Sequence, residues 1–330
     1  MKELIKALVE TYGPAGHEEQ VRALITERVK DYADEIRTDA LGSLIVLKKG
    51  TGGGKRIMIA AHMDEIGVVV AFVDKKGFVR FGRLGGLSPL TVLGRRVRFA
   101  NGTVGVIAWE KGRYPTSMPT WEEIYLDVGA TSPEDCPVGI GDAACFDDKF
   151  VEQGDRLISK AMDNRMGCAV GVQALLEMGE SPNDVYFVFT VQEEVGLRGA
   201  TASAFGVEPE VGIALDVTLT GDTPEASPMC VSLGKGTAIK VMDSSVIAHP
   251  GVKNWMVKTA ERIGAPYQLE ILTAGGTDTA AIQRSRAGVP AGCLSVPTRY
   301  VHTPSEMVHY GDVRATVDVL AELLRKPVEL

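Results

Sequence analysis

The feature that most constrains the fold of this chain is a long segment without helical periodicity, which interrupts an alternating α/β pattern. Between Gly67 and about Ser159 the sequence consists of short runs rich in β-branched and aromatic residues, separated by Gly, Pro, Asn and Asp. This pattern is typical of consecutive β-strands. The runs are GVVVAFV, FVRFG, RRVRFA, TVGVIAW, EIYLDVG and ACFDDKF. We therefore expect a small all-β unit over residues 67–158.

The residues on either side of this segment alternate between helical and extended patterns. Two helices are expected in the N-terminal 40 residues, around a break at Gly13, Pro14 and Gly16. Further elements follow in the order strand 44–47, strand 56–61, helix 164–178, strand 184–191, strand 211–215, helix 253–263, strand 291–296 and helix 313–324. Continuous apolar strands suit a sheet that is covered on both faces. The sequence thus predicts an α/β fold with a doubly wound mixed sheet, built from residues 1–66 and 159–330, with the β unit inserted between them.

The charge balance excludes several classes of protein. The 330 residues include 35 Lys and Arg against 43 Asp and Glu, a net charge of −8, whereas nucleic acids and anionic membranes bind clustered positive charge. No stretch approaches the ~20 apolar residues of a membrane span. The first residues carry Glu3 and Glu10 and lack the apolar run of a signal peptide. We expect a cytoplasmic protein, with neither nucleic acid nor a membrane as a partner.

The cysteines do not predict a covalent framework. The chain has five, an odd number, widely spaced and without a CxxC pair, so neither a set of disulfides nor a thiolate zinc site is expected. We interpret them as buried thiols in a reducing compartment. They are Cys136, Cys145, Cys168, Cys230 and Cys293.

Metal-ligating residue types recur where apolar strands end or a helix begins. These residues are His62, Asp64, Asp163, Glu193, Glu194, Asp216 and His302. In open α/β sheets, ligands bind outside the carboxyl ends of the strands. We therefore expect these side chains to converge, although His62 and His302 lie far apart in the sequence.

Each of these residues also has an ordinary interpretation, and His62 and Asp64 could be exposed in a turn. Asp163 could serve only as the cap of the following helix, and Asp216 as a cap or turn residue. Glu193 and Glu194 could belong to a solvated acidic loop, and His302 to a surface loop. Buried together, however, adjacent carboxylates are costly unless they are paired or bind a metal.

Two His and three carboxylates suit two borderline divalent ions. Zinc binds imidazole nitrogen and carboxylate oxygen, and two neighbouring ions share one bridging carboxylate. A further carboxylate then remains as a base, as in two-metal hydrolases. Zn²⁺ is the expected ion, and Co²⁺ or Mn²⁺ suits the same ligands.

The sequence resembles a known family in the motifs AAHMDEIG, KAMDNRMGC, VQEEVGLRGA, ALDVT and RYVHTPSEM, in this order and spacing. GPAGHEE near the N-terminus and AGGTDTAAI also fit. The family is that of the di-zinc metallo-aminopeptidases of the tetrahedral (TET) type, which includes glutamyl aminopeptidases and proteins labelled "cellulase M". The resemblance covers essentially the whole chain and implies an aminopeptidase-like catalytic domain acting on peptides.

The resemblance also implies a role for each residue. Asp163 would bridge the two ions. The site of one ion would be completed by His62 and Asp216, and that of the other by Glu194 and His302. The general base would be Glu193, and the supporting acid beside His62 would be Asp64. The inserted β unit would mediate dimerisation, and dimers would build a hollow dodecamer.

Two other functions remain as alternatives. A glycoside hydrolase such as an endoglucanase needs two carboxylates facing each other across about 5–9.5 Å, but needs neither His nor a bridging Asp. A non-catalytic metal-binding assembly protein would have no use for Glu193 beyond a full ligand set. The sequence does not identify substrate-binding residues, so the preferred N-terminal residue, whether Glu or Asp, Leu or Lys, stays open.

Overall fold

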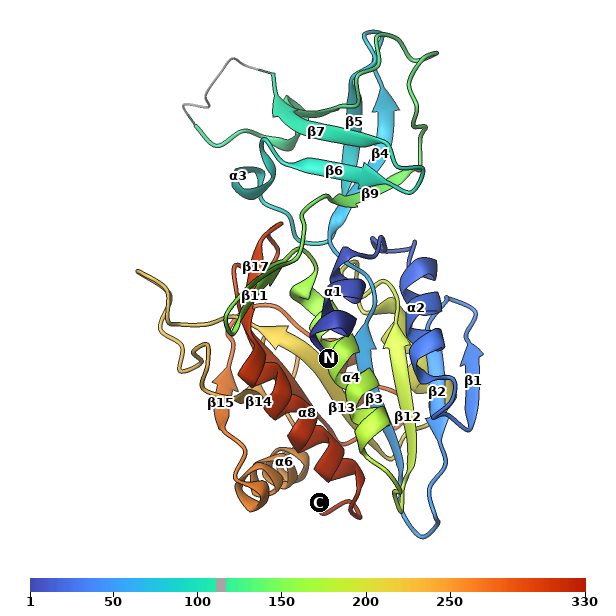
Figure 1. The fold of residues 1–330 in the computed structure, drawn as a ribbon, viewed down its shortest axis with the longest axis vertical. Coiled ribbons are helices and arrows are strands. Elements are labelled where there is room, and N and C mark those ends of the chain that lie inside the picture. The colour runs from blue at the N-terminus through green and yellow to red at the C-terminus, as the bar shows by residue number, and fades with distance from the viewer. Residues whose placement is uncertain (111–116) are drawn as a thin grey trace.

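The fold consists of a large mixed sheet with helices on both faces and a small closed barrel beside it (Figure 1). The computed structural model describes residues 1–110 and 117–330. Its helices are α1 (Lys2–Glu10), α2 (Glu19–Val29), α3 (Pro89–Val92), α4 (Met162–Glu177), α5 (Arg198–Val207), α6 (Pro250–Ile263), α7 (Asp278–Gln283), α8 (Tyr310–Leu324) and the 3-10 helix η1 (Trp121–Glu123).

The large sheet is formed by the two ends of the chain. Its strands lie in the order β1 (Glu35–Thr38), β2 (Leu44–Lys48), β12 (Asp184–Thr190), β3 (Arg56–His62), β13 (Val211–Thr218), β16 (Ala291–Arg299), β17 (Glu306–His309), β11 (Arg156–Ser159) and β10 (Val151–Gln153). Next to β16 lies β14 (Thr237–Met242), which pairs with β15 (Tyr267–Ile271). The central strands β12, β3, β13 and β16 are mutually parallel, so their carboxyl ends share one edge.

The side chains of β3 show why the sheet is covered on both faces. Ile57 and Ile59 belong to the core beneath α1, α4 and α8, whereas Met58 and Ala60 pack with residues of α5 and α7 on the other face. All four are at most 2% exposed. This alternation of two buried faces is the physical basis of the doubly wound sheet, and the predicted fold class is confirmed.

The barrel has a hydrophobic core of its own. Its strands close in the order β4 (Gly67–Val73), β5 (Val79–Leu84), β8 (Ile124–Asp127), β7 (Val104–Trp109), β6 (Arg96–Phe99) and β9 (Ala143–Phe146). Inward residues such as Val68, Phe99, Ile107 and Leu126 are at most 2% exposed. In Figure 1 the barrel stands above the edge toward which the arrows of β3 and β12 point.

The two strands that follow the barrel, β10 and β11, belong to the large sheet, although the expected inserted unit extends to residue 158. Strands β10 and β11 pair with each other, and β11 pairs with β17 in the large sheet, with Arg156 opposite His309. The barrel itself ends with β9, at Phe146. Pairing between segments this far apart leaves no signal in the local sequence, because it depends on where the fold places β17.

A buried ionic network holds the N-terminal segment against the end of β3 and the start of α4. The guanidinium of Arg165 donates to the backbone carbonyls of Leu8 (2.5 Å) and Met63 (2.7 Å) and to Glu65 Oε1 (3.2 Å). Lys160 also contacts Glu65, at 2.7 Å. These three charged side chains are almost completely buried, so α1, the end of β3 and the start of α4 are held in one arrangement.

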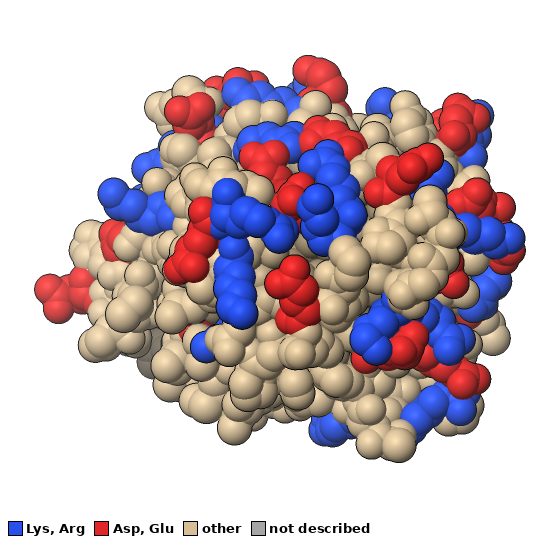
Figure 2. Space-filling model, turned by 90° about the horizontal axis from the view of Figure 1, so that it is seen from below, with Lys and Arg blue, Asp and Glu red and all other residues tan. Residues whose placement is uncertain are grey.

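The surface carries charges of both signs, and the cysteines are free. Figure 2 shows acidic and basic side chains interspersed over the face seen from below. Among the described residues, no helix has the length and apolar character needed to cross a bilayer. All five cysteines are free; Cys145, Cys168 and Cys293 are buried as expected, whereas Cys230 is exposed.

Candidate metal centre

The predicted ligands converge at the edge where the parallel strands end. His62 is the last residue of β3, and Glu193 and Glu194 follow β12. Asp216 lies within β13, which continues to Thr218 rather than ending at residue 215. His302 follows β16 in a short loop. The sequence prediction that these residues meet is therefore matched by their positions.

Asp163 sits at the centre of the cluster, in the first turn of α4. The backbones of Asp163 and Asn164 are non-helical, and the side chain of Asn164 accepts the N–H of Gly167 at 2.9 Å, so Asn164 rather than Asp163 caps the regular part of this helix. Asp163 Oδ1 lies 3.1 Å from Nε2 of His62, and its Oδ2 lies 3.3 Å from Nε2 of His302. One carboxylate oxygen thus faces each imidazole, which is the arrangement a bridging carboxylate requires.

The other ligand atoms surround the same two positions. His302 Nε2 lies 3.3 Å from Glu194 Oε2. His62 Nε2 lies 3.8 Å from Glu193 Oε2 and 3.9 Å from Asp216 Oδ1. Ligand atoms at 2.0–2.2 Å from a tetrahedral zinc ion lie about 3.3–3.6 Å from one another. These separations fit ligand shells, and two groups, His62 with Asp163 and Glu194, and His62 with Glu193 and Asp216, are compact enough to hold an ion.

The charges of the cluster call for cations. Burial and the neighbouring carboxylate of Asp163 raise the pKa of Glu194 to about 8. Burial likewise raises the pKa values of Glu193 and Asp216 well above their usual range. In addition, Oε1 of Glu194 is buried and has no hydrogen-bond partner among the described residues. Carboxylates in excess of nearby positive charge, one with a free oxygen, fit divalent ions.

The imidazole of His302 is held by neighbouring acids on one side and by a backbone carbonyl on the other. Although burial opposes the charged form, the hydrogen bond to Asp163 and the charge of Glu194 raise the pKa of His302 to about 10. The Nδ1 of His302 lies 3.0 Å from the carbonyl oxygen of Gly86, to which it can only donate. This contact fixes the ring so that Nε2, the nitrogen that faces Asp163, binds a metal ion when the ion displaces its proton.

Asp64 supports both His62 and the two glutamates. His62 Nδ1 lies 3.1 Å from the backbone oxygen and 3.4 Å from the carboxylate of Asp64. The same carboxylate accepts the backbone N–H groups of Glu193 (3.0 Å) and Glu194 (3.1 Å). Asp64 therefore orients the end of β3 and the loop after β12 together.

Glu306 is a residue of the site that the sequence analysis did not single out. This buried side chain of β17 accepts the backbone N–H of Asp163 through Oε2 (2.9 Å) and that of His302 through Oε1 (2.8 Å). It ties the start of α4 to the loop after β16. The only sequence signal was its place in the motif RYVHTPSEM, since nothing local distinguishes a buried glutamate from an exposed one.

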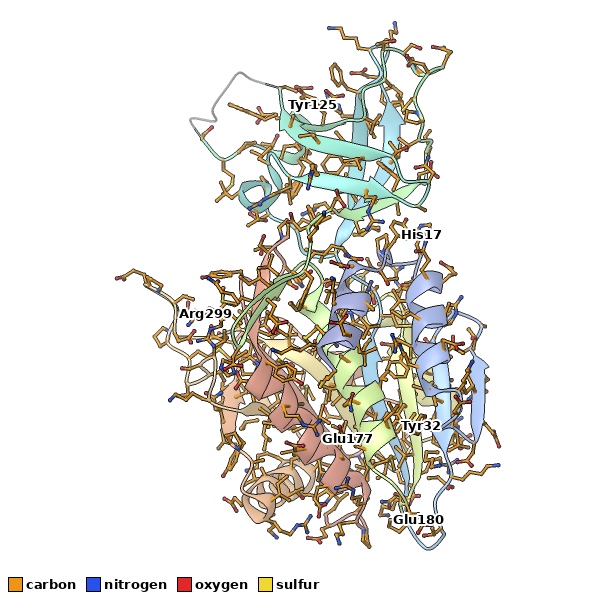
Figure 3. All side chains as sticks on the ribbon, viewed as in Figure 1. His17, Tyr32, Tyr125, Glu177, Glu180 and Arg299 are labelled. Carbon is orange, nitrogen blue, oxygen red and sulfur yellow. The ribbon has the colours of Figure 1, made fainter. Side chains whose placement is uncertain are left out.

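Two further histidines, His17 and His309, lie outside the cluster. His17 is in the N-terminal segment, on the side facing the barrel (Figure 3), where Tyr12, Phe99 and Asn101 surround a separate hollow. His309 caps α8 by accepting the N–H of Gly311. The structure thus separates the two predicted ligand histidines from these two.

The chain is similar to known peptidases over nearly its whole length. Residues 42–319 match the family described as M42 glutamyl aminopeptidase. The chain belongs to the M42 aminopeptidase family. A putative aminopeptidase of Acetivibrio thermocellus is 49% identical over 326 residues, which cover 98% of each chain.

Solved structures agree with this assignment. Aminopeptidase APDkam598 from Desulfurococcus kamchatkensis has a TM-score of 0.95 at 38% identity, covering 99% of this chain and 94% of that one. The TET1 peptidase of Pyrococcus horikoshii, which can assemble into a tetrahedron or a large octahedral shell, has a TM-score of 0.89 at 32% identity, covering 98% and 99%. The resemblance to TET aminopeptidases is confirmed.

Replacing Glu306 tests its positioning role. In Glu306→Gln one carboxylate oxygen becomes an NH₂ group that faces a backbone N–H, so Asp163 or His302 loses its anchor. We expect zinc affinity to fall about 10- to 100-fold, measured by competition with a chromogenic chelator. Asp312→Asn is the matched control, because Asp312 is buried and accepts the N–H groups of Gly234 and Gly236. Equal zinc affinity in both variants would contradict the role.

Proposed function

We propose that this M42 family member is a metal-dependent aminopeptidase that removes N-terminal residues from short peptides by two-metal hydrolysis. The two divalent ions are Zn²⁺ in the first place, with Co²⁺ or Mn²⁺ suited to the same nitrogen and oxygen ligands. The observation that carries the proposal is Asp163, whose two carboxylate oxygens face His62 and His302 separately. With Asp163 as the bridge, His62 and Asp216 would complete one site, and Glu194 and His302 the other.

The chain's own residues would position the substrate and move the proton. When bound, the ions would polarise the scissile carbonyl and lower the pKa of a water molecule. Glu193 groups with His62 and Asp216 in the cluster, next to the place proposed for one ion and its water molecule. As general base it would accept the proton of the attacking water and then return it to the leaving amine. The excess of carboxylates would also favour the free α-ammonium group of a peptide.

This arrangement supports a peptidase rather than a glycoside hydrolase. A glycosidase needs two carboxylates held apart on opposite sides of a sugar. Here the carboxylates gather around two imidazoles, with His62 within 4 Å of oxygens of Asp163, Glu193 and Asp216. A non-catalytic assembly protein that only holds metal ions would not need Glu193 in addition to a full set of ligands.

A substrate panel tests the proposed activity. We expect hydrolysis of aminoacyl p-nitroanilides (Glu, Asp, Leu, Lys and Ala) that stops with a chelator and returns with Zn²⁺ or Co²⁺. N-acetylated substrates should not react, because the free α-amine is part of recognition. If two metal ions are bound per chain and none of the panel is hydrolysed, the proposed function is wrong.

Two conservative variants separate the base from the bridge. Glu193→Gln should retain both ions and the fold but lower kcat by about 10²–10⁴-fold, the usual contribution of a general base. Asp163→Asn should instead lose one or both ions, as measured by elemental analysis. Full turnover in the first variant would place the base elsewhere, and an unchanged metal content in the second would refute the bridging role.

The proposed assembly is a hollow dodecamer built from dimers that the barrel joins. The resemblance to TET peptidases supports it, as do large apolar side chains that the barrel region exposes. Leu90 is 66% exposed and Ile140 is 76% exposed, and contact between barrels would cover such side chains. Light scattering should give a mass near twelve times 35.3 kDa, and a mass of one chain would contradict the proposal.

A further inference from the structure

A cavity of about 600 Å³ opens directly over the candidate metal centre. This volume lies in the range of small-ligand sites. One side is formed by the clustered His and carboxylate residues. The rest of the wall comes from the end of β13, from the loops after β12, β13, β15 and β16, and from Gly86 after β5. Its apolar side chains are Leu197, Val217, Leu219, Leu272, Ala274 and Val301.

This wall has no charged side chain among the described lining residues, once the candidate ligands and Glu193 are set aside. Leu219 illustrates its character, because the side chain is 42% exposed. An apolar side chain at the mouth of a cavity gains free energy when a bound molecule covers it. A charged group placed against the same wall would lose hydration without a partner.

The two hydroxyl groups of the wall already donate their protons within the protein. Thr218 Oγ1 donates to Glu270 Oε1 at 2.9 Å, and Thr277 Oγ1 donates to Thr279 Oγ1 at 2.9 Å. Neither is therefore available as a donor to a substrate carboxylate. Glu270 in turn pairs with the fully buried Lys240. This lysine therefore offers no positive charge to a molecule in the cavity.

We infer that this cavity receives the first side chain of the peptide, and that the side chain is uncharged and apolar, of the kind found in Leu or Met. The inference rests on the proposed aminopeptidase function. It differs from the glutamyl preference that the family description names. The physical reason is that the wall offers apolar surface and no counter-ion for either sign of charge.

Specificity constants for p-nitroanilides of Leu, Met, Ala, Glu and Lys test the inference on the metal-loaded enzyme. We expect kcat/KM for Leu and Met to exceed those for Glu and Lys by at least about tenfold, and Ala to fall between them, as for a pocket that recognises methylene groups. A preference for Glu or for Lys would overturn the inference and leave the aminopeptidase function standing. Inactivity toward all five would refute the function itself.

Opposite charges at one position of the wall give a sharper test. Leu219→Arg should raise the Glu-to-Leu ratio of kcat/KM by about two- to fivefold, and Leu219→Glu should raise the Lys-to-Leu ratio similarly, since one ion pair is gained in each case. A merely structural defect would lower all substrates together. If the two variants shift the ratios in the same direction, or leave them unchanged, the first side chain does not lie against this wall.

The control uses the same substitutions outside the cavity. Ile263 is also a half-exposed apolar residue, but it lines a different hollow, next to α8. Ile263→Arg and Ile263→Glu should leave all substrate ratios as in the unchanged enzyme. Equal effects at both positions would trace the shift to overall charge and overturn the assignment of the wall.

Discussion

The concentration of carboxylates at one buried edge of the sheet is the constraint on which the rest of the structure depends. Asp163, Glu193, Glu194 and Asp216 gather around two imidazoles, and burial together with neighbouring carboxylates raises the pKa values of Glu193, Glu194 and Asp216. Such a cluster is costly without cations. Strands β3 and β13, helix α4 and the loops after β12 and β16 contribute candidate ligands, and β17 contributes the side chain of Glu306 that holds two of them in place.

Backbone hydrogen bonds to acidic side chains give the cluster its shape. Asp64 holds the loop after β12, and Glu306 joins the start of α4 to the loop after β16. The barrel takes part as well, because the carbonyl oxygen of Gly86, at its base, lies against Nδ1 of His302. The inserted unit thus orients a candidate ligand, and the two units of the chain meet at the site.

The sequence predicted the strands and helices whose hydrophobic pattern is strong, and it missed those whose pattern is weak. Strands β3 and β12 and helix α8 were found because each has a continuous or regularly spaced apolar face. Strands β1 and β10 are largely exposed and short, so their apolar pattern carries no signal. Strand β17 is defined by pairing with β11, about 150 positions away, which no local window contains.

The candidate ligands could be chosen from the sequence because residue chemistry and strand ends are local properties. A His or carboxylate that follows an apolar strand is visible in a short window, and parallel strands bring their ends to one edge. Only the tertiary structure decided that Asp163 faces both imidazoles, that Glu306 anchors two of the candidate ligands, and that an uncharged wall lies over the site. Most of these contacts join segments far apart in the sequence, as Asp163 does with His302 and with Glu306. They are set by the packing of the whole sheet and leave no trace in local sequence.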